Sequence, residues 1–565
     1  MKNFTKMAGL VLLLCGVPVP GGGDAMAQSY DYERSVLVLT GASSMEELGE
    51  EVMDRFSAMA SRPLRINAAS EARMVSSGLF SRYRAASVVD YRRRNGDILS
   101  VMELMLVDGF DEMSARALEP FLSFEAYSKD AGAGPVQVET VSRASVKSQE
   151  EVSQWNYAVK LRVGDDDRWS VGIAAKSAYG DARWPPGTIS GSLSLSGRGG
   201  RWRLVAGDFN TRFGQGLVQW SGFSLSGAQS AASFAKHPSG ISPAWTLSPT
   251  AAQRGIAAEA VTGRLVTSVF ASENVPFGGN FTYLARYGQL GLTALSSGRV
   301  SFDWRWSFGK TDTFGEMALD ASGKSSAGVV GCTYNPEYQV RVSALARSYA
   351  PSYDGTGAGA FRSSTKSSDE VGGALAFDYR KLVLTADMAF HPSRETSQHK
   401  AVLKYSPQIS EYCGLEFKAV SRYRPEDSRR WRNEMRAGLT RSFPSGFMLH
   451  FCADACFCRE LSLLAFTEAG YESEGENGSF RAYLRATFFK VDSWDDRIYV
   501  YERDVQGAFS VPAYYGRGWS CCGVAVWKWK KGGTLNIRAS FLDYPWMEKE
   551  KPGRAELKCQ LIRNF

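Results

Sequence analysis

The nine residues "FRAYLRATF", from Phe480 to Phe488, alternate between apolar and polar side chains. Apolar side chains stand at the even-numbered positions, and Arg, Tyr, Arg and Thr stand at the odd-numbered ones. A period of two residues is that of a β-strand, because successive side chains point to opposite faces of a sheet. This stretch therefore predicts a strand with one apolar and one polar face.

The same alternation recurs throughout residues 137–565. Examples are "VRVSALAR" (340–347), "LEFKAVS" (415–421) and "LNIRASF" (535–541), and turns rich in Gly, Asn, Asp and Pro separate such segments. Two architectures fit this pattern, a series of soluble β domains or one transmembrane barrel. Polar faces rich in Arg and Lys, small apolar faces and aromatic residues near strand ends favour a barrel with its apolar side toward lipid. No linker divides the region, as separate domains would require.

The last residues, "AELKCQLIRNF" (555–565), place apolar side chains on one face and end in Phe565. A final strand with a terminal aromatic residue resembles the signal by which the barrel assembly machinery sorts outer-membrane barrels. The predicted fold is thus mainly β: a large antiparallel transmembrane β-barrel over residues 137–565, preceded by a small all-α domain. At roughly 20 residues per strand and turn, we expect about 18–24 strands. A barrel that wide encloses a lumen unless something plugs it.

The amino-terminal residues predict export. Lys2 and Lys6 precede an apolar run, and Ala25-Met26-Ala27 forms a small-x-small cleavage site, so residues 1–27 are interpreted as a signal peptide. Cys15 raises the alternative of a lipoprotein, but Leu14 precedes it where a small residue is usual. No later segment approaches the ~18 apolar residues of a membrane helix. The expected location is the outer membrane, in contact with its lipid.

Between the signal and the strands, the pattern is helical. Residues 28–44 are expected to be a linker, 45–128 a helical domain and 129–136 a second linker that contains "DAGAGP". In the helical domain, Leu48, Val52, Phe56 and Met59 recur at the spacing of an amphipathic helix. The domain is expected on the periplasmic side, either below the barrel or inside its lumen.

Within this domain, residues 63–121 resemble the tandem helix-hairpin-helix of ComEA-type competence DNA receptors. The matching positions are Asn67, Ala69, Gly78-Leu79, Ala85, Tyr91-Arg92, Gly96, Gly109-Phe110 and Pro120. The chain departs at the second glycine of each hairpin, where Phe80 and Asp111 stand. In DNA-binding members glycine lets the hairpin amides approach a phosphate, so both replacements argue against phosphate contact.

Charge divides the two hairpins. Residues 61–96 hold eight Arg against two acids, a net of +6, whereas residues 97–130 hold two cations against eight acids, a net of −6. Only the first hairpin is therefore a candidate for DNA or another anion, such as lipopolysaccharide phosphate; the alternative is a protein-docking or plug module. The candidate residues are Gly78, Leu79, Arg82, Arg84, Arg92, Arg93 and Arg94.

The whole layout resembles a family of Gram-negative outer-membrane proteins that join an amino-terminal helix-hairpin-helix to a barrel. The barrel segments at residues 207–223 and 499–519 carry this resemblance, which implies an architecture and no activity. The leading hypothesis is a channel or assembly component whose periplasmic hairpin domain gates the lumen or docks a periplasmic or outer-membrane protein partner. The alternative is a DNA-uptake receptor that binds double-stranded DNA.

No catalytic, cofactor or metal site is expected, and the chain is interpreted as a protein without enzymatic activity. Phosphate-loop, serine-elbow and His-Glu-x-x-His motifs are absent from a sequence with only four His. "HFCADACFCRE" carries His450, Cys452, Cys456 and Cys458 with one parity. On a strand the outer two lie roughly 26 Å apart, too far to bind one ion.

Overall fold

The computed structural model describes residues 25–565 except 127–135, 151, 166–167, 182, 198–200, 226, 248–251, 321–322, 338, 426–430, 531 and 548–550. Most of the predicted signal peptide and of the predicted linker 129–136 lies outside the described residues.

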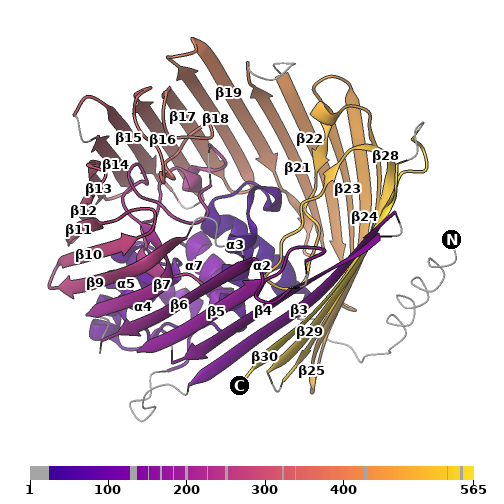
Figure 1. Ribbon diagram of the computed structural model, residues 1–565, viewed down its shortest axis with the longest axis horizontal. Coiled ribbons are helices and arrows are strands. Elements are labelled where there is room, and N and C mark those ends of the chain that lie inside the picture. Colours follow the sequence, from indigo (N-terminus) through magenta and orange to yellow (C-terminus); the bar gives the residue numbers. More distant parts are fainter. Residues whose placement is uncertain are drawn as a thin grey trace.

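In the part of the chain that is described, 24 strands close into one antiparallel barrel (Figure 1). Each strand pairs with its neighbours in sequence, and the first strand, β3, pairs with the last, β30, from Glu139 opposite Asn564 to Gln149 opposite Arg554. This confirms the predicted barrel, and the strand number falls at the upper limit of the expected range.

The first half of the ring consists of β3 (Gln137–Gln149), β4 (Val152–Gly164), β5 (Trp169–Lys176), β6 (Thr188–Ser196), β7 (Trp202–Arg212), β9 (Gln253–Thr262), β10 (Leu265–Ser272), β11 (Gly278–Leu284), β12 (Gly288–Leu295), β13 (Val300–Phe308), β14 (Thr311–Leu319) and β15 (Ser326–Tyr334). The second half consists of β16 (Val340–Tyr349), β17 (Glu370–Tyr379), β18 (Leu382–His391), β19 (Thr396–Tyr405), β21 (Cys413–Tyr423), β22 (Trp431–Ser442), β23 (Phe447–Phe457), β24 (Leu461–Gly475), β25 (Gly478–Val491), β28 (Gly516–Trp529), β29 (Gly533–Asp543) and β30 (Arg554–Asn564). The short strands β8 (Gly240–Pro243) and β20 (Gln408–Ser410) each pair with one ring strand.

The two ends of the barrel differ in the length of their connections. Residues 213–252, 350–369 and 492–515 connect strands at one end, which we call the loop end. The other end, the turn end, carries shorter connections together with the start of β3 and the end of β30. The long connections therefore lie together, at the end opposite the point where the chain enters and leaves the barrel.

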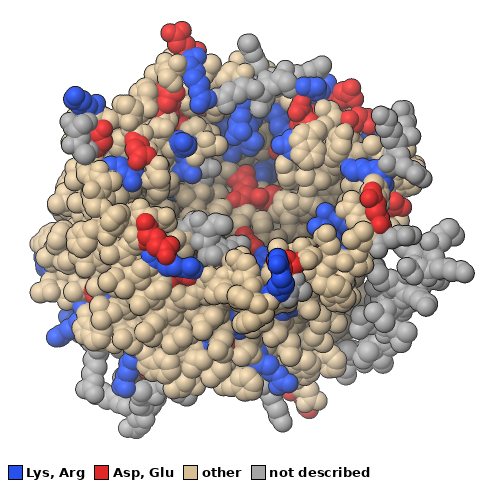
Figure 2. All heavy atoms as spheres, in the orientation of Figure 1, with Lys and Arg blue, Asp and Glu red and all other residues tan. Residues whose placement is uncertain are grey.

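The outer face of the wall is apolar. On β25, Leu484 and Phe488 point outward and are exposed, whereas Arg485 and Thr487 point inward and are buried. The alternation in "FRAYLRATF" is therefore an alternation between lipid and lumen. Figure 2 shows the same division, with Lys, Arg, Asp and Glu gathered at the rim and in the central hollow and a largely uncharged wall below.

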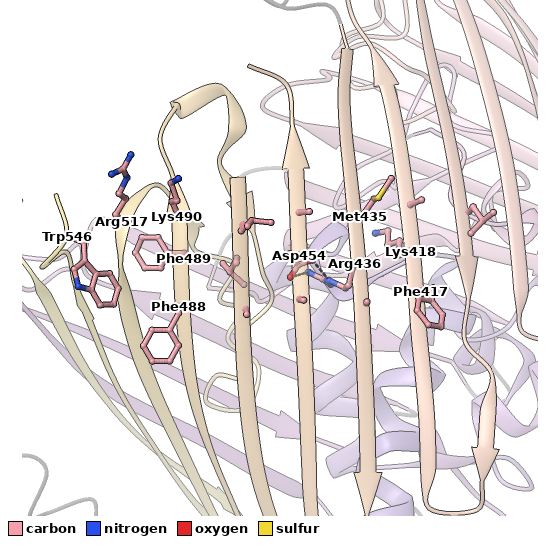
Figure 3. Close-up of a pocket in the computed structure, with 18 residues that line it drawn as sticks. Phe417, Lys418, Met435, Arg436, Asp454, Phe488, Phe489, Lys490, Arg517 and Trp546 are labelled. Carbon is pink, nitrogen blue, oxygen red and sulfur yellow. Dashed lines mark hydrogen bonds and ion pairs between the residues drawn. The ribbon is translucent and has the colours of Figure 1, made fainter. Parts of the chain in front are cut away.

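A groove of about 900 Å³ interrupts this outer face over β21–β25 (Figure 3). Its floor holds small side chains, and aromatic and aliphatic side chains border it. We refer to it below as the wall groove.

The helices lie inside the ring of strands (Figure 1). They are α2 (Ala25–Thr40), η1 (Met45–Glu47), α3 (Glu50–Ser61), α4 (Glu71–Ser77), α5 (Arg82–Asn95), α6 (Val101–Leu104), α7 (Glu112–Leu118) and η2 (Glu119–Phe121). We call residues 25–126 the plug. The expected linker 28–44 is instead mostly helix α2, because Val36 is buried in the plug core and Leu37 and Leu39 pack against that core.

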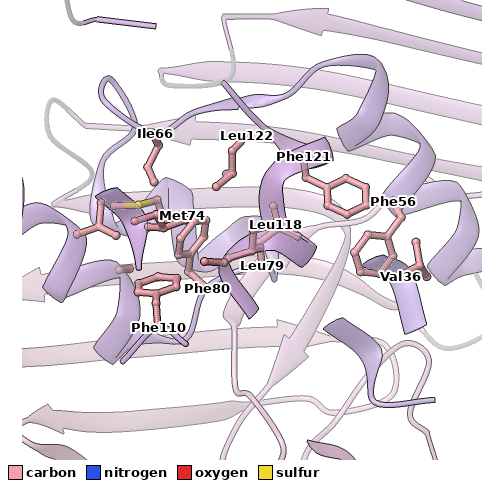
Figure 4. Close-up of a cluster of buried hydrophobic side chains, with 14 of the residues drawn as sticks. Val36, Phe56, Ile66, Met74, Leu79, Phe80, Phe110, Leu118, Phe121 and Leu122 are labelled. Carbon is pink, nitrogen blue, oxygen red and sulfur yellow. The ribbon is translucent and has the colours of Figure 1, made fainter. Parts of the chain in front are cut away.

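The plug has its own hydrophobic core (Figure 4). Phe56 and Phe121 lie with ring centroids 5.1 Å apart, which joins α3 to η2. Strand β1 (Leu64–Arg65), which follows α3, runs parallel to β2 (Leu122–Ser123) near the end of the plug. The plug is therefore one packed body held by contacts between residues far apart in sequence.

Candidate functional site: the interface between plug and wall

Six acidic side chains of α2, η1 and α3 face cations of the barrel. Each pair has an N–O distance between 2.6 and 3.8 Å. The pairs are Glu33–Arg503, Glu46–Arg436, Glu47–Lys418, Glu50–Arg143, Glu50–Lys176, Glu51–Arg212 and Asp54–Lys160. We call this set the acid contacts of the plug.

Local sequence explains why the acids gather on one side. In "EEVMDRF" (50–56), Glu50, Glu51 and Asp54 share one face of α3, because residues three or four apart on a helix are neighbours. Val52, Met53 and Phe56 point to the plug core and are buried. The helix therefore has one side for packing and one side for the wall.

Glu46 contacts both the wall and an inserted loop. It accepts hydrogen bonds from Arg436, at 2.6 Å, and from the backbone N–H of Tyr501, at 3.1 Å. Burial acts to raise the pKa of Glu46, but the charges of Arg436 and Lys418 outweigh burial and hold that pKa well below its usual range. Glu46 is therefore ionised at neutral pH, and its charge stabilises the contact between plug and wall.

Loops from the loop end cover the plug. Phe223 donates its backbone N–H to Glu51 at 2.7 Å, and Ser230 donates to the carbonyl of Gly41 at 2.8 Å. In the loop 492–515, which contains β26 (Ile498–Tyr499) and β27 (Ala513–Tyr514), Gln506 donates to Ser61 at 2.6 Å. The plug is thus held by the wall around it and by loops on one side.

The structure does not gather the predicted anion-binding arginines into one open face. Arg82 pairs with Glu259 of β9 at 3.1 Å, and both side chains are 5% exposed. Arg92 donates to the carbonyls of Ile66 and Ala69, each at 2.8 Å. These two side chains are engaged by the protein itself.

The remaining candidates divide between interior and surface. Arg84 donates to the carbonyl of Gly109 at 2.8 Å, and Arg93 and Arg94 are exposed at the end of α5. Gly78 ends α4 with φ of +74°, a conformation that favours glycine, and Leu79 is buried. Gly78 and Leu79 therefore have structural roles in the hairpin turn.

Both departures from the DNA-receptor pattern have a packing role. Phe80 is 2% exposed and packs against Phe110 with centroids 5.9 Å apart. Asp111 accepts from the backbone N–H of Ser114 to cap α7, and it pairs with Arg341 of β16 at 2.7 Å. The first replacement fills the plug core and the second joins the plug to the wall.

Among the plug side chains that the structure describes, four large apolar ones are exposed. They are Leu99, Met102, Leu106 and Met113, which are between 40% and 72% exposed. They flank Asp111, whose partner Arg341 lies at the turn end of β16. We call these four residues the apolar patch; it belongs to the part of the plug nearest the turn end.

Sequence reasoning missed the acid contacts and identified the arginines of α5 instead. The available signal was the acidic run "EELGEEVMD" (46–54), ahead of a barrel whose inward positions carry Arg and Lys.

Among the described residues no group of three His, Cys, Asp or Glu is placed to hold a metal ion. His237 contacts Arg305, with Nδ1 2.6 Å from the guanidinium. None of the described helices combines the length and apolarity needed to cross a membrane.

Comparison with known proteins gives matches among solved structures only. No model of a known protein family matches the chain, and no curated protein matches it. OccK3 (OpdO) of Pseudomonas aeruginosa is 8% identical over 76% of this chain and 96% of its own, with a TM-score of 0.31. The translocation pore of the P pilus usher PapC is 8% identical over 76% of this chain and 99% of its own, with a TM-score of 0.34. OccAB4 of Acinetobacter baumannii is 8% identical over 76% of this chain and 98% of its own, with a TM-score of 0.30. Similarities of this size leave the function to be inferred from the chain's own side chains.

Proposed function

We propose that the protein is an outer-membrane channel, without enzymatic activity, whose plug controls passage through the lumen. The observation that carries this proposal is the set of acid contacts, in which six acids of the plug each face a cation of the wall or of an inserted loop. Ion pairs of this kind hold the plug in position, and they weaken when a charge is removed or the salt concentration rises. The plug can therefore be released by such a change. The apolar exterior supports a location in lipid.

The apolar patch supports a docking role for the turn-end side of the plug. Exposed Met and Leu side chains on a soluble surface are typical of protein-interaction sites, and Met adapts to different partners. With the turn end facing the periplasm, a periplasmic protein would reach the patch directly. Binding there would move the plug and thereby open the lumen.

The alternative of a DNA-uptake receptor receives less support from the contacts of α5. Arg82, Arg84 and Arg92 already bond to protein groups, and exposed Arg94 pairs with Asp90 of the same helix. This leaves Arg93 and, in competition with Asp90, Arg94 for an external polyanion. Duplex DNA titrated onto the purified protein at low salt tests this alternative. Binding that weakens steeply with salt and disappears on Arg93→Ala/Arg94→Ala would favour it.

Ion conductance across a planar bilayer tests the channel proposal. Replacing Glu46, Glu51 and Asp54 by their amides removes three acid contacts with little change in side-chain volume. We expect this variant to conduct more, or to open more often, than the wild type. The matched control is Glu476→Gln, since Glu476 is exposed in the turn between β24 and β25. Wild-type and triple-variant proteins with equal conductance, both folded, would contradict a gating plug.

A further inference from the structure

The wall groove is a recess in the lipid-facing surface, and its floor follows from strand register. Ala453 of β23 lies opposite Ala437 of β22 and opposite Ala465 of β24. Ala455, the next outward position on β23 toward the loop end, extends this floor. Three neighbouring strands thus present methyl groups side by side, so the surface is hollowed there.

Larger side chains border the groove on both sides. Phe417 and Met435 stand on one side, and Phe488 and Trp546 stand on the other (Figure 3). Leu463 of β24, opposite Ala455, also lines the groove. All five are at least 43% exposed. The volume of about 900 Å³ lies within the range of sites that hold small molecules, about 300–1,000 Å³.

One end of the groove is charged. Lys490 of β25 lies opposite Arg517 of β28, both beside the loop end. Asp492 contacts both cations, Arg517 at 2.5 Å and Lys490 at 3.8 Å. Among the described residues two cations face this one carboxylate, which is a surplus of one positive charge. The side chains of Lys490 and Arg517 are 59% and 44% exposed.

We propose that the wall groove binds a phosphate-bearing lipid from the leaflet at the loop end. An acyl chain lies over the alanine floor, and the phosphate lies at Lys490 and Arg517, from which it accepts charge-assisted hydrogen bonds. This proposal requires the barrel to lie in a membrane and is independent of whether the plug gates the lumen.

The shape and charge of the groove favour an amphiphile over a protein partner. An acyl lipid has a narrow apolar body with charge at one end, which is the distribution that the groove presents. A second barrel would offer a convex apolar face, and a stable protein interface needs more than about 1,000 Å² of matched surface. Lys490 and Arg517 would then be left against apolar side chains, which is unfavourable for charged groups.

Native mass spectrometry of the full-length protein, with lipid added in detergent, tests the proposal. The probes are lipid A, phosphatidylglycerol, uncharged diacylglycerol and inorganic phosphate. We expect the two phosphate-bearing lipids to stay bound and diacylglycerol and free phosphate to be lost. Ala453→Phe fills the groove, and Lys490→Gln/Arg517→Gln removes the cations; each should weaken retention of phosphate-bearing lipid by about tenfold or more.

Matched controls separate site binding from general lipid coating. Ala386→Phe adds the same ring at another outward position, on β18, and Lys530→Gln removes a cation from an exposed turn at the opposite end. Both should retain lipid as the wild type does. Heat-dependent gel migration reports whether each variant forms a barrel, and the Gln pair tests the site if Ala453→Phe does not fold. Equal retention by all proteins, equal retention of diacylglycerol, or a protein dimer abolished by Ala453→Phe would overturn the proposal.

Discussion

Glu46→Gln is an informative single perturbation of the plug, because Glu46 contacts both Arg436 of the wall and Tyr501 of an inserted loop. The amide keeps the shape of the side chain and can still accept from Tyr501, but it loses the charge opposite Arg436. We expect the plug to fold normally and to be held less firmly in the lumen.

The magnitude follows from burial and from the contacts that remain. Removing one partner of a fully buried ion pair costs about 3–5 kcal/mol. Here the side chains of Arg436 and Glu46 are 16% and 14% exposed, and Arg436 keeps Asp454 at 2.7 Å. Solvent and this second carboxylate reduce the loss to roughly 1.5–3 kcal/mol. Since 1.4 kcal/mol corresponds to a factor of ten, plug release becomes about 10- to 100-fold more frequent.

Single-channel recording in planar bilayers measures that frequency as the fraction of time spent in a conducting state. Raising the salt concentration should narrow the difference between wild type and Glu46→Gln, because salt screens the charges that the wild type uses. Glu476→Gln, in an exposed turn, should behave as the wild type at every salt concentration. The reasoning is refuted if Glu46→Gln, shown to be folded, conducts like the wild type at low salt.

Three further predictions concern stability. Burial, with the charges of Arg362 and Arg212, lowers the pKa of Lys236 to about 7. Between pH ~7 and ~10 the unfolded chain therefore holds a proton on Lys236 that the folded protein does not, so thermal stability should rise over this range. Lys236→Met should flatten that rise in melting curves recorded at a series of pH values. Phe80→Gly should destabilise the plug by about 3–5 kcal/mol in denaturant unfolding, whereas exposed Met102→Ala should have little effect. Asp111→Asn keeps the cap of α7 but loses the pairing with Arg341, so the same unfolding experiment should show a loss of only about 1 kcal/mol.

The strands of the wall were predictable from sequence because each one shows the alternation of apolar and polar residues within its own length. In "AELKCQLIRNF" the residues expected on one face are Ala555, Leu557, Cys559, Leu561 and Phe565. The last four are exposed, and Ala555 is half-buried. Arg563, the exception on that face, is also exposed. A period of two is a local property, so a few neighbouring residues suffice to recognise it.

The position of the plug was not predictable, because it depends on contacts between distant residues. Glu46 and Arg436 lie 390 positions apart, and Asp54 and Lys160 lie 106 apart. The residues next to each acid in the sequence do not indicate which cation it contacts. The helix in residues 28–44 was missed for a related reason, since Val36 becomes a core residue only when the rest of the plug packs around it.

The seam between β3 and β30 has a consequence for biogenesis. The plug precedes β3, so it is synthesised before any of the wall, whereas the ring is complete only when Asn564 lies opposite Glu139. Long-range strand pairings of this kind form slowly. We therefore expect the wall to be wrapped around a plug that is already folded. The plug then acts as a template, since a strand inserted one residue out of register would turn its cations to the lipid and leave the acids of α3 without partners.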